Sequence, residues 1–205
     1  MPATAAAPGR PVFRVLYVCT GNLCRSPMAQ SITTLRLAEA LGADADRFSV
    51  TSAGTQPVVG AEMAPGAQRA LAAHGVPALA TRARALEHAQ VAEADLILTA
   101  AREHRAVVAR LLPLATRRCF TIVDFDRLTR QVDPTDLPDH DPVDRAARLV
   151  VRVGGLRGTL PPLHPAKVDL PDPYGRPDDH FDACVRSLLQ LTAYWPTLLA
   201  GQPSA

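Results

Sequence analysis

The chain of 205 residues lacks several features that mark specialised classes of protein. Its four cysteines are too few for a disulfide scaffold, and no Cys-x-x-Cys pair suggests a zinc site. No run of 18 apolar residues is present, so we expect no membrane span. The 22 basic and 20 acidic residues form no long block of one sign, and the net charge is only +2. We therefore expect a globular protein that binds neither nucleic acid nor membrane.

The ends and the middle of the chain differ in composition. Residues 1–11 lack the apolar core of a secretory signal, so we expect a disordered tail there. Residues 12–200 are long enough to form one sizeable domain. Within it, the segment at about 124–170 carries six prolines. We expect this segment to form a long irregular excursion over the surface, with a short helix at about 143–152.

Strand-like and helix-like segments alternate along the chain. This order predicts an α/β fold, a single domain with a four-stranded parallel sheet and helices on both faces. Short apolar runs indicate the strands, and apolar residues at helical spacing indicate the helices. The expected strands span about 13–19, 48–53, 95–99 and 118–123, and the expected helices span about 27–41, 65–74, 101–112 and from 177 onward, where Pro196 should kink or shorten the last helix.

Residues 19–26 read Cys-Thr-Gly-Asn-Leu-Cys-Arg-Ser and lie between the first expected strand and helix. Five residues follow Cys19 before Arg25, the spacing of a thiolate nucleophile at the base of a loop that wraps a phosphate group. Ser26 and Pro27 predict a helix start, with Ser26 as its N-cap. Free backbone N–H groups and the positive end of the helix dipole would favour an anion there.

The residue types in this loop suit phosphoryl transfer. A helix N-terminus and a nearby cation favour the thiolate form of a cysteine, and Cys19 would have both. Arg25 can bind two phosphoryl oxygens as a planar fork. Ser26 can hydrogen-bond the thiolate, Gly21 allows a tight bend, and Asn22 tolerates a left-handed conformation. The expected phosphate-binding and substrate-binding residues also include Thr20, Leu23 and Cys24.

This string resembles the active-site loop of the low-molecular-weight protein tyrosine phosphatases. The resemblance continues, in the family's order, with the strings TSAGT at 51–55, ADLIL at 94–98 and DPYG at 172–175, and it covers roughly residues 12–200. It implies a flavodoxin-like or Rossmann-like phosphatase domain and a phosphocysteine mechanism without cofactor or metal. In that mechanism Cys19 is the nucleophile, Arg25 the phosphate clamp and Asp172 the general acid.

The general acid has rivals in this sequence. Three Asp-Pro pairs occur, and proline holds the preceding aspartate extended in a stiff turn. Only Asp172 is followed by Tyr-Gly and then the last helix, as in the family. The resemblance gives it two tasks: to protonate the leaving oxygen and then to activate water against phosphocysteine. Asp169 is the nearest rival.

Phosphotyrosine in a protein is the substrate that the resemblance favours. Leu23 and Tyr174 would offer apolar walls to a phenyl ring. A related branch of the family removes phosphate from arginine and carries threonine where this chain has Leu23. The tyrosine phosphatases often carry an aromatic residue soon after the second string, where this chain has Gln56–Val59. Protein arginine phosphatase therefore stays an alternative, with arsenate reductase and a non-catalytic phosphoprotein-binding module as less favoured ones.

Supporting residues and cellular setting complete the expectations. The resemblance suggests that Ser52 supports Asn22 and Ser26, and that Thr81 stands where relatives carry a supporting histidine. His104 falls on a charged helix face and is expected at the surface. The acidic residues at 133–144 lack the pattern of a calcium loop, so we expect a solvated loop.

A thiolate nucleophile needs a reducing compartment, so we expect a cytoplasmic protein, as a monomer or weak dimer.

One further expectation concerns oxidation of the loop. Cys24 lies within the same loop as Cys19, and an oxidised Cys19 could form a reversible disulfide with it.

Overall fold

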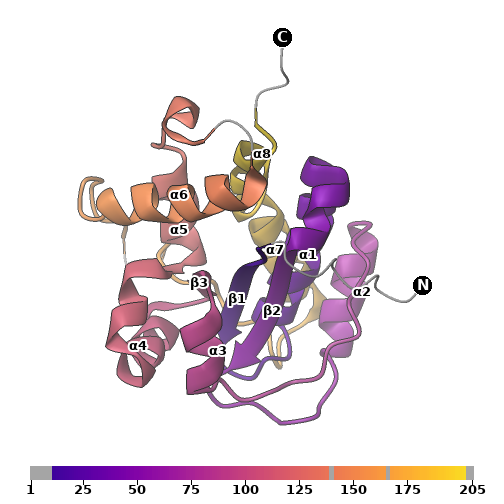
Figure 1. Cartoon of the computed structure of the whole chain (residues 1–205). Coiled ribbons are helices and arrows are strands. Elements are labelled where there is room, and N and C mark those ends of the chain that lie inside the picture. The colour runs from indigo at the N-terminus through magenta and orange to yellow at the C-terminus, as the bar shows by residue number, and fades with distance from the viewer. Residues whose placement is uncertain (1–10, 139–140, 165–166, 202–205) are drawn as a thin grey trace.

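A computed structural model describes residues 11–138, 141–164 and 167–201 of the chain. Its sheet is parallel throughout, with the strand order β2-β1-β3-β4 (Figure 1). The predicted α/β fold with a four-stranded parallel sheet is therefore confirmed. The expected tail lies almost wholly outside the described residues. The strands are β1 (Phe13–Cys19), β2 (Phe48–Gly54), β3 (Leu96–Thr99) and β4 (Cys119–Thr121).

Helices cover both faces of the sheet (Figure 1). None of those in the described part of the chain is long and apolar enough to cross a membrane. The α-helices are α1 (Arg25–Leu41), α2 (Pro65–Ala73), α3 (His88–Glu93), α4 (Arg102–Leu111), α5 (Ile122–Thr129), α6 (Pro142–Gly155), α7 (Asp178–Leu191) and α8 (Tyr194–Leu199), and the short 3₁₀ helices are η1 (Gly42–Arg47), η2 (Pro113–Arg118) and η3 (Pro134–Asp136).

The central strand β1 explains the two layers of the core. Its side chains alternate between the faces of the sheet, as the pleat requires. Val15 and Tyr17 join a cluster that includes residues of α1, α2 and α5 to α8. Leu16 and Val18 join a smaller cluster with residues of α3, α4 and η2. Because both faces of the sheet are covered, nearly all residues of β1 are apolar.

The strand order fixes where a ligand can bind. β1 pairs with β2 on one side and β3 on the other, so the direction of winding reverses between β1 and β3. In open parallel sheets, such a switch point opens a crevice at the carboxyl ends of the strands. The loop after Cys19 lies at this edge, beside Gly54 at the end of β2.

Two predicted helix boundaries need correction. α1 begins at Arg25, with Cys24 as its N-cap, so Ser26 is not the cap and Pro27 is the third helical residue. This is allowed because the first turn of a helix has no intrahelical partners for its N–H groups. The last expected helix is not kinked at Pro196 but divided before it: α7 ends at Leu191, and Pro196 lies in the first turn of a separate helix, α8.

The predicted surface excursion at about 124–170 is wrong for α5 and α6, which pack in the core. β4 ends at Thr121, whose hydroxyl accepts the Asp124 N–H and caps α5. α5 and α6 both contribute residues to the main core, including Phe125 and Leu149. The proline-rich stretches are the connections on either side of α6. The short helix expected at about 143–152 is confirmed as the central part of α6.

The acidic stretch at 133–144 is partly structural. Asp141 accepts the Val143 N–H as the N-cap of α6, and it also binds the buried guanidinium of Arg47 in η1. These contacts hold the start of α6 against the rest of the domain. Asp139 and His140 of the same stretch lie outside the described residues.

We predict that Leu149→Ala lowers the free energy of unfolding by about 2–5 kcal/mol, because it leaves a cavity between α6 and the main core. Leu149 is 1% exposed. The neighbouring Arg148 is exposed, so Arg148→Ala is the matched control and should change stability by less than about 0.5 kcal/mol. Denaturant unfolding measures both variants. Equal and small effects would mean that α6 is peripheral.

Candidate active site

The loop between β1 and α1 lines a small pocket at the switch point of the sheet. The pocket has a volume of about 200 Å³. Two segments distant in sequence complete its wall, one after β2 and one before α7. Asn22 and Ser26 are buried beneath the loop. The residues that line the pocket are Cys19, Thr20, Gly21, Leu23, Cys24, Arg25, Gln56, Val58, Asp172 and Tyr174.

The N-terminus of α1 is open to an anion. Its N-cap residue, Cys24, makes no side-chain cap hydrogen bond, and its first turn contains no acidic residue. The N–H groups of a first helical turn lack intrahelical acceptors and lie at the positive end of the helix dipole. α1 therefore offers free donors and positive potential to an anion in the pocket.

A close backbone approach sets the shape of the loop. At Gly54 a Cβ atom would lie 2.5 Å from the carbonyl oxygen of Thr20, so only glycine fits there. Asn22 has a φ of 55°, the left-handed conformation that the sequence predicted for it. Its Oδ1 accepts the backbone N–H of Arg84 at 3.0 Å. The segment before α3 thus supports the loop through the backbone of Arg84, a contact that the sequence did not predict.

A chain of hydrogen bonds ends at the sulfur of Cys19. Ser26 Oγ lies 3.0 Å from Cys19 Sγ, and Asn22 Nδ2 donates to Ser26 Oγ at 2.9 Å. The same amide donates to Ser52 Oγ at 2.9 Å, and Ser52 donates to Gln30 Oε1 at 2.8 Å. Ser26 accepts from Asn22, and its own proton has two acceptors within reach, the Cys19 sulfur at 3.0 Å and the Ala53 carbonyl oxygen at 3.5 Å. The chain of hydrogen bonds thus places a hydroxyl group directly beside the Cys19 sulfur.

The guanidinium of Arg25 is buried beside the loop, with 4% of the residue exposed. Its NH2 donates to Asp172 Oδ2 at 2.5 Å and to Thr20 Oγ1 at 3.1 Å, and its NH1 donates to the carbonyl oxygen of Leu170 at 3.3 Å. Its Nε is buried and has no hydrogen-bond partner among the described residues. Arg25 thus retains an unused donor within the loop.

The two candidate acids occupy different positions. Asp172 lines the pocket and is 44% exposed at its side chain. Asp169 instead accepts both the backbone N–H and the guanidinium of Arg102. Burial alone would raise the pKa of Asp169, but these hydrogen bonds outweigh it and the pKa lies below its ordinary value. Asp169 therefore stays ionised and is held away from the pocket lining.

Comparisons with known proteins agree with this geometry. A family model described as low molecular weight phosphotyrosine protein phosphatase matches residues 14–148. The chain belongs to this family. A low molecular weight protein-tyrosine-phosphatase of Streptomyces coelicolor is 31% identical over 174 residues, which cover 84% of this chain and 85% of that protein.

Two other similar proteins differ in the activity that their names give. A protein-arginine-phosphatase of Geobacillus stearothermophilus is 32% identical over 113 residues, covering 55% of this chain and 71% of that protein. Among solved structures, the low molecular weight protein tyrosine phosphatase from T. tengcongensis superposes with a TM-score of 0.62. That match has 26% identity and covers 88% of this chain and 95% of the other. Both tyrosine and arginine phosphatases are therefore similar to this member of the family.

The cysteines of this family member differ in their surroundings. Burial raises the pKa of Cys24, Cys119 and Cys184 to about 12 in each case. These three are held as neutral thiols near pH 7. All four cysteines are free in the structure. Of the two loop cysteines, only Cys19 has a hydroxyl donor, that of Ser26, beside its sulfur.

The expectation for His104 was wrong. This residue of α4 is 1% exposed, and its Nε2 lies 2.9 Å from Thr20 Oγ1. Burial and the charge of Arg25 lower its pKa, so its imidazole is neutral near pH 7. Its charged neighbours along the helix predicted a surface position. The contact with Thr20 spans 84 residues of sequence, so no local pattern predicts it.

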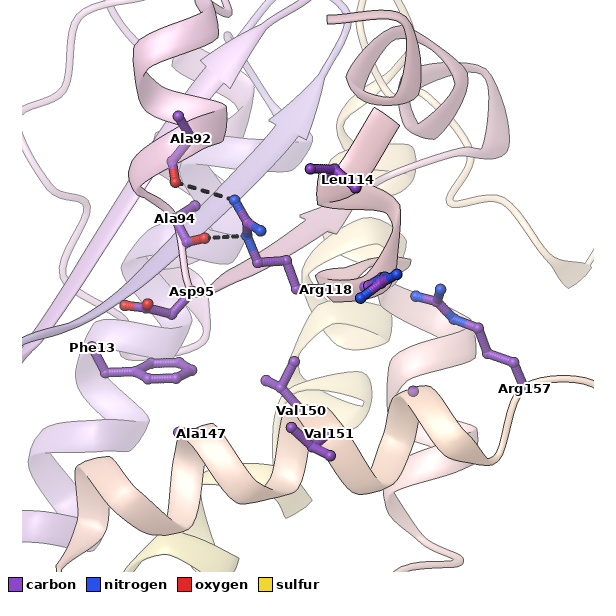
Figure 2. A pocket seen from close by; sticks show the side chains of 12 residues that line it. Phe13, Ala92, Ala94, Asp95, Leu114, Arg118, Ala147, Val150, Val151 and Arg157 are labelled. Atoms are coloured by element: carbon purple, nitrogen blue, oxygen red, sulfur yellow. Dashed lines mark hydrogen bonds between the residues drawn. The ribbon is translucent and has the colours of Figure 1, made fainter. Parts of the chain in front are cut away.

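A larger hollow, of about 740 Å³, lies at the opposite edge of the sheet in this phosphatase-family domain (Figure 2). Phe13 at the start of β1 and Val150 of α6 form part of its lining. Arg118 donates to the carbonyl oxygens of Ala92 and Ala94 at 3.1 and 2.6 Å, which satisfies acceptors at the end of α3. Arg118 is structural here, and no predicted site residue lines this hollow.

Proposed function

We propose that the protein is a phosphatase that hydrolyses phosphotyrosine in proteins through a phosphocysteine intermediate. The observation that carries this proposal is the arrangement at the pocket: the Cys19 sulfur beside a hydroxyl donor, a buried Arg25 with an unused Nε donor, and Asp172 in the wall. A phosphoryl group on the loop would give Nε an acceptor and place its phosphorus against the sulfur. Membership of the family supports the same reaction.

The first step forms a bond between sulfur and phosphorus. The Cys19 thiolate attacks phosphorus as the bond from phosphorus to the tyrosyl oxygen breaks, and Asp172 donates its proton to that oxygen. Charge on the other phosphoryl oxygens is stabilised by Arg25 and by the N–H groups at the start of α1. These oxygens would compete with Asp172 for the NH2 protons of Arg25, which releases the carboxyl group toward the leaving oxygen.

The second step restores the enzyme. The Asp172 carboxylate accepts a proton from water as that water attacks phosphorus, and the bond between phosphorus and sulfur breaks. The products are inorganic phosphate and the Cys19 thiolate, which the Ser26 hydroxyl stabilises as it leaves. These steps use no metal and no cofactor. A reducing compartment such as the cytoplasm keeps the thiolate active.

The wall of the pocket favours an aryl group. Leu23, Val58 and Tyr174 present apolar surface around the opening, and a phenyl ring can lie between them. Val58 occupies the wall where tyrosine phosphatases often carry an aromatic residue. Arginine dephosphorylation is the second candidate, because the arginine phosphatase from Geobacillus stearothermophilus is 32% identical over the matched region. Gln56, a polar residue of the same wall, is compatible with that substrate.

Arsenate reduction and simple phosphoprotein binding are less well supported. Reduction would require later cysteines that relay electrons as thiolates, and burial raises the pKa of both Cys119 and Cys184 to about 12. A binding module would need neither a nucleophile nor an acid. The oligomeric state stays a prediction, with a monomer or weak dimer expected.

Cys19→Ser should abolish turnover of p-nitrophenyl phosphate but leave binding of inorganic phosphate measurable by calorimetry, because the loop and Arg25 remain. Cys24→Ser is the matched control and should retain most activity, since Cys24 is held as a neutral thiol. Near-normal turnover by Cys19→Ser would overturn the assignment of the nucleophile. Phosphate binding by the wild type without any turnover would identify a binding module.

Asp172→Asn should slow phosphotyrosine hydrolysis by about 10²–10⁴-fold, the range typical for loss of a general acid. Formation of phosphocysteine from p-nitrophenyl phosphate should suffer less, because p-nitrophenolate leaves without much protonation. Rapid-quench measurement of this first step separates it from the later hydrolysis. Asp169→Asn is the control. A larger, leaving-group-dependent loss in Asp169→Asn would transfer the role of acid to Asp169.

Leu23→Thr should shift the ratio of kcat/KM values from phosphotyrosine toward phosphoarginine, because it replaces an apolar wall by a polar one. Wild type and variant would be assayed side by side on phosphotyrosine, phosphoarginine and phosphoserine peptides of one sequence. A wild-type preference for phosphoarginine would show that the substrate is phosphoarginine and that the apolar-wall argument is wrong.

A further inference from the structure

The contact of His104 with the phosphate-binding loop is not used in the mechanism above. His104 reaches the loop from α4, and its Nε2 lies 2.9 Å from Thr20 Oγ1. The same oxygen accepts a hydrogen bond from Arg25 NH2 at 3.1 Å. Thr20 thus links the imidazole to the guanidinium that the proposed reaction uses as phosphate clamp.

The tautomer of His104 decides which atom donates in this link. Arg25 is only a donor, so the Thr20 oxygen accepts from it and is left with its own proton to give. A neutral imidazole with an unprotonated Nε2 can accept that proton. The proton of the ring then lies on Nδ1, which is buried and has no hydrogen-bond partner among the described residues. Only the Nε2 side of the ring is therefore engaged.

We propose that His104 is a positioning residue for Arg25: its neutral Nε2 accepts the Thr20 hydroxyl proton and so holds the Thr20 oxygen as an acceptor for the clamp. The proposal rests on the proposed phosphatase function. The hydrogen bond restrains one NH2 group of Arg25, and the carbonyl oxygen of Leu170 restrains NH1. With both ends fixed, the guanidinium is preorganised for a phosphoryl group.

Protonation of His104 would reverse the donor and the acceptor in its hydrogen bond with Thr20. A cationic imidazole carries a proton on Nε2, so it can only donate to Thr20, and it adds positive charge near Arg25. The charged groups that act on the ring are Arg25, Glu103, Asp172 and Asp169. Glu103 Oε1 lies 3.4 Å from Nε2 but belongs to an exposed side chain. Burial and Arg25 outweigh the three carboxylates, so the pKa of His104 lies below its ordinary value.

A matched pair of variants tests the role of Nε2. The amide of His104→Gln can reach the position of Nε2, whereas that of His104→Asn can reach only the position of Nδ1. We expect kcat/KM for p-nitrophenyl phosphate to stay within about threefold of wild type in His104→Gln and to fall about tenfold in His104→Asn, the loss typical of a hydrogen bond in a charged network. Equal losses in both variants, with equal shifts in Tm, would show a packing role and overturn the proposal.

Thr20 provides a second measurement. Thr20→Val should lower kcat/KM, and the loss in Thr20→Val with His104→Asn should not exceed that in Thr20→Val alone, because both act through one hydroxyl. Additive losses would overturn the link. An inactive wild type would instead contradict the proposed function, so the two failures are distinguishable.

The dependence on pH tests the protonation state. The ratio of kcat/KM between wild type and His104→Gln should be constant near pH 7 and fall as the pH drops through the lowered pKa of His104, because only the wild type gains a charge there. Titration of other groups cancels in this ratio. A ratio that instead rises as the pH drops would show that a protonated, donating Nε2 serves the clamp, and would overturn the proposal.

Discussion

The register between β1 and β2 is the constraint on which the site depends. The two strands pair in parallel over their full lengths, and the last pair joins Cys19 to Gly54. The chain must then leave β1 directly over Gly54, where the Thr20 carbonyl oxygen occupies the space of a Cβ atom. Any side chain at this position would push the loop off the sheet. The sulfur, the loop and the start of α1 are therefore placed by backbone pairing.

A second constraint is the cost of burying polar groups beneath that loop. Asn22, Ser26 and Ser52 are all buried, and each unsatisfied polar group there would cost about 1–3 kcal/mol. Asn22 donates to both Ser26 and Ser52, Ser52 donates to Gln30, and Ser26 lies beside the Cys19 sulfur, so each buried group has a partner. Reversal of one hydroxyl would leave two donors or two acceptors facing each other. The network thus favours a single loop conformation, with the Ser26 hydroxyl beside the sulfur.

The sequence predicted the parts of the site that depend on near neighbours. The loop at 19–26, its left-handed Asn22 and the strand before it follow from a short string, because turn chemistry and strand patterning act over a few residues. His104 contacts Thr20 across 84 residues of sequence, and Arg84 contacts Asn22 across 62. Local sequence patterns therefore could not predict either contact. The predicted start of α1, at residue 27, is two residues too late, because proline is tolerated throughout a first helical turn.

The second half of the fold was harder to predict for a related reason. The segment from β4 to α6 contains three of the six prolines that led us to expect an irregular surface at about 124–170. In the structure prolines stand at the first position of η3 and α6, where a missing N–H costs nothing. The apolar residues between them supply one face of α6 and pack on the sheet. Two of the prolines therefore mark helix starts, and helical periodicity was the better guide to α6.

The position of Asp172 connects the core to the site. The backbone N–H of Leu170 donates to the carbonyl oxygen of Ala100, just beyond β3, and the carbonyl oxygen of Leu170 accepts from Arg25. Asp172 follows two residues later and meets the same guanidinium. A buried arginine without such acceptors would be strongly destabilising. The hydrogen bonds from Arg25 to Leu170 and Asp172 satisfy the buried guanidinium, and they also bring the candidate acid to the pocket. The segment 170–172 is therefore constrained both by stability and by the chemistry of the site.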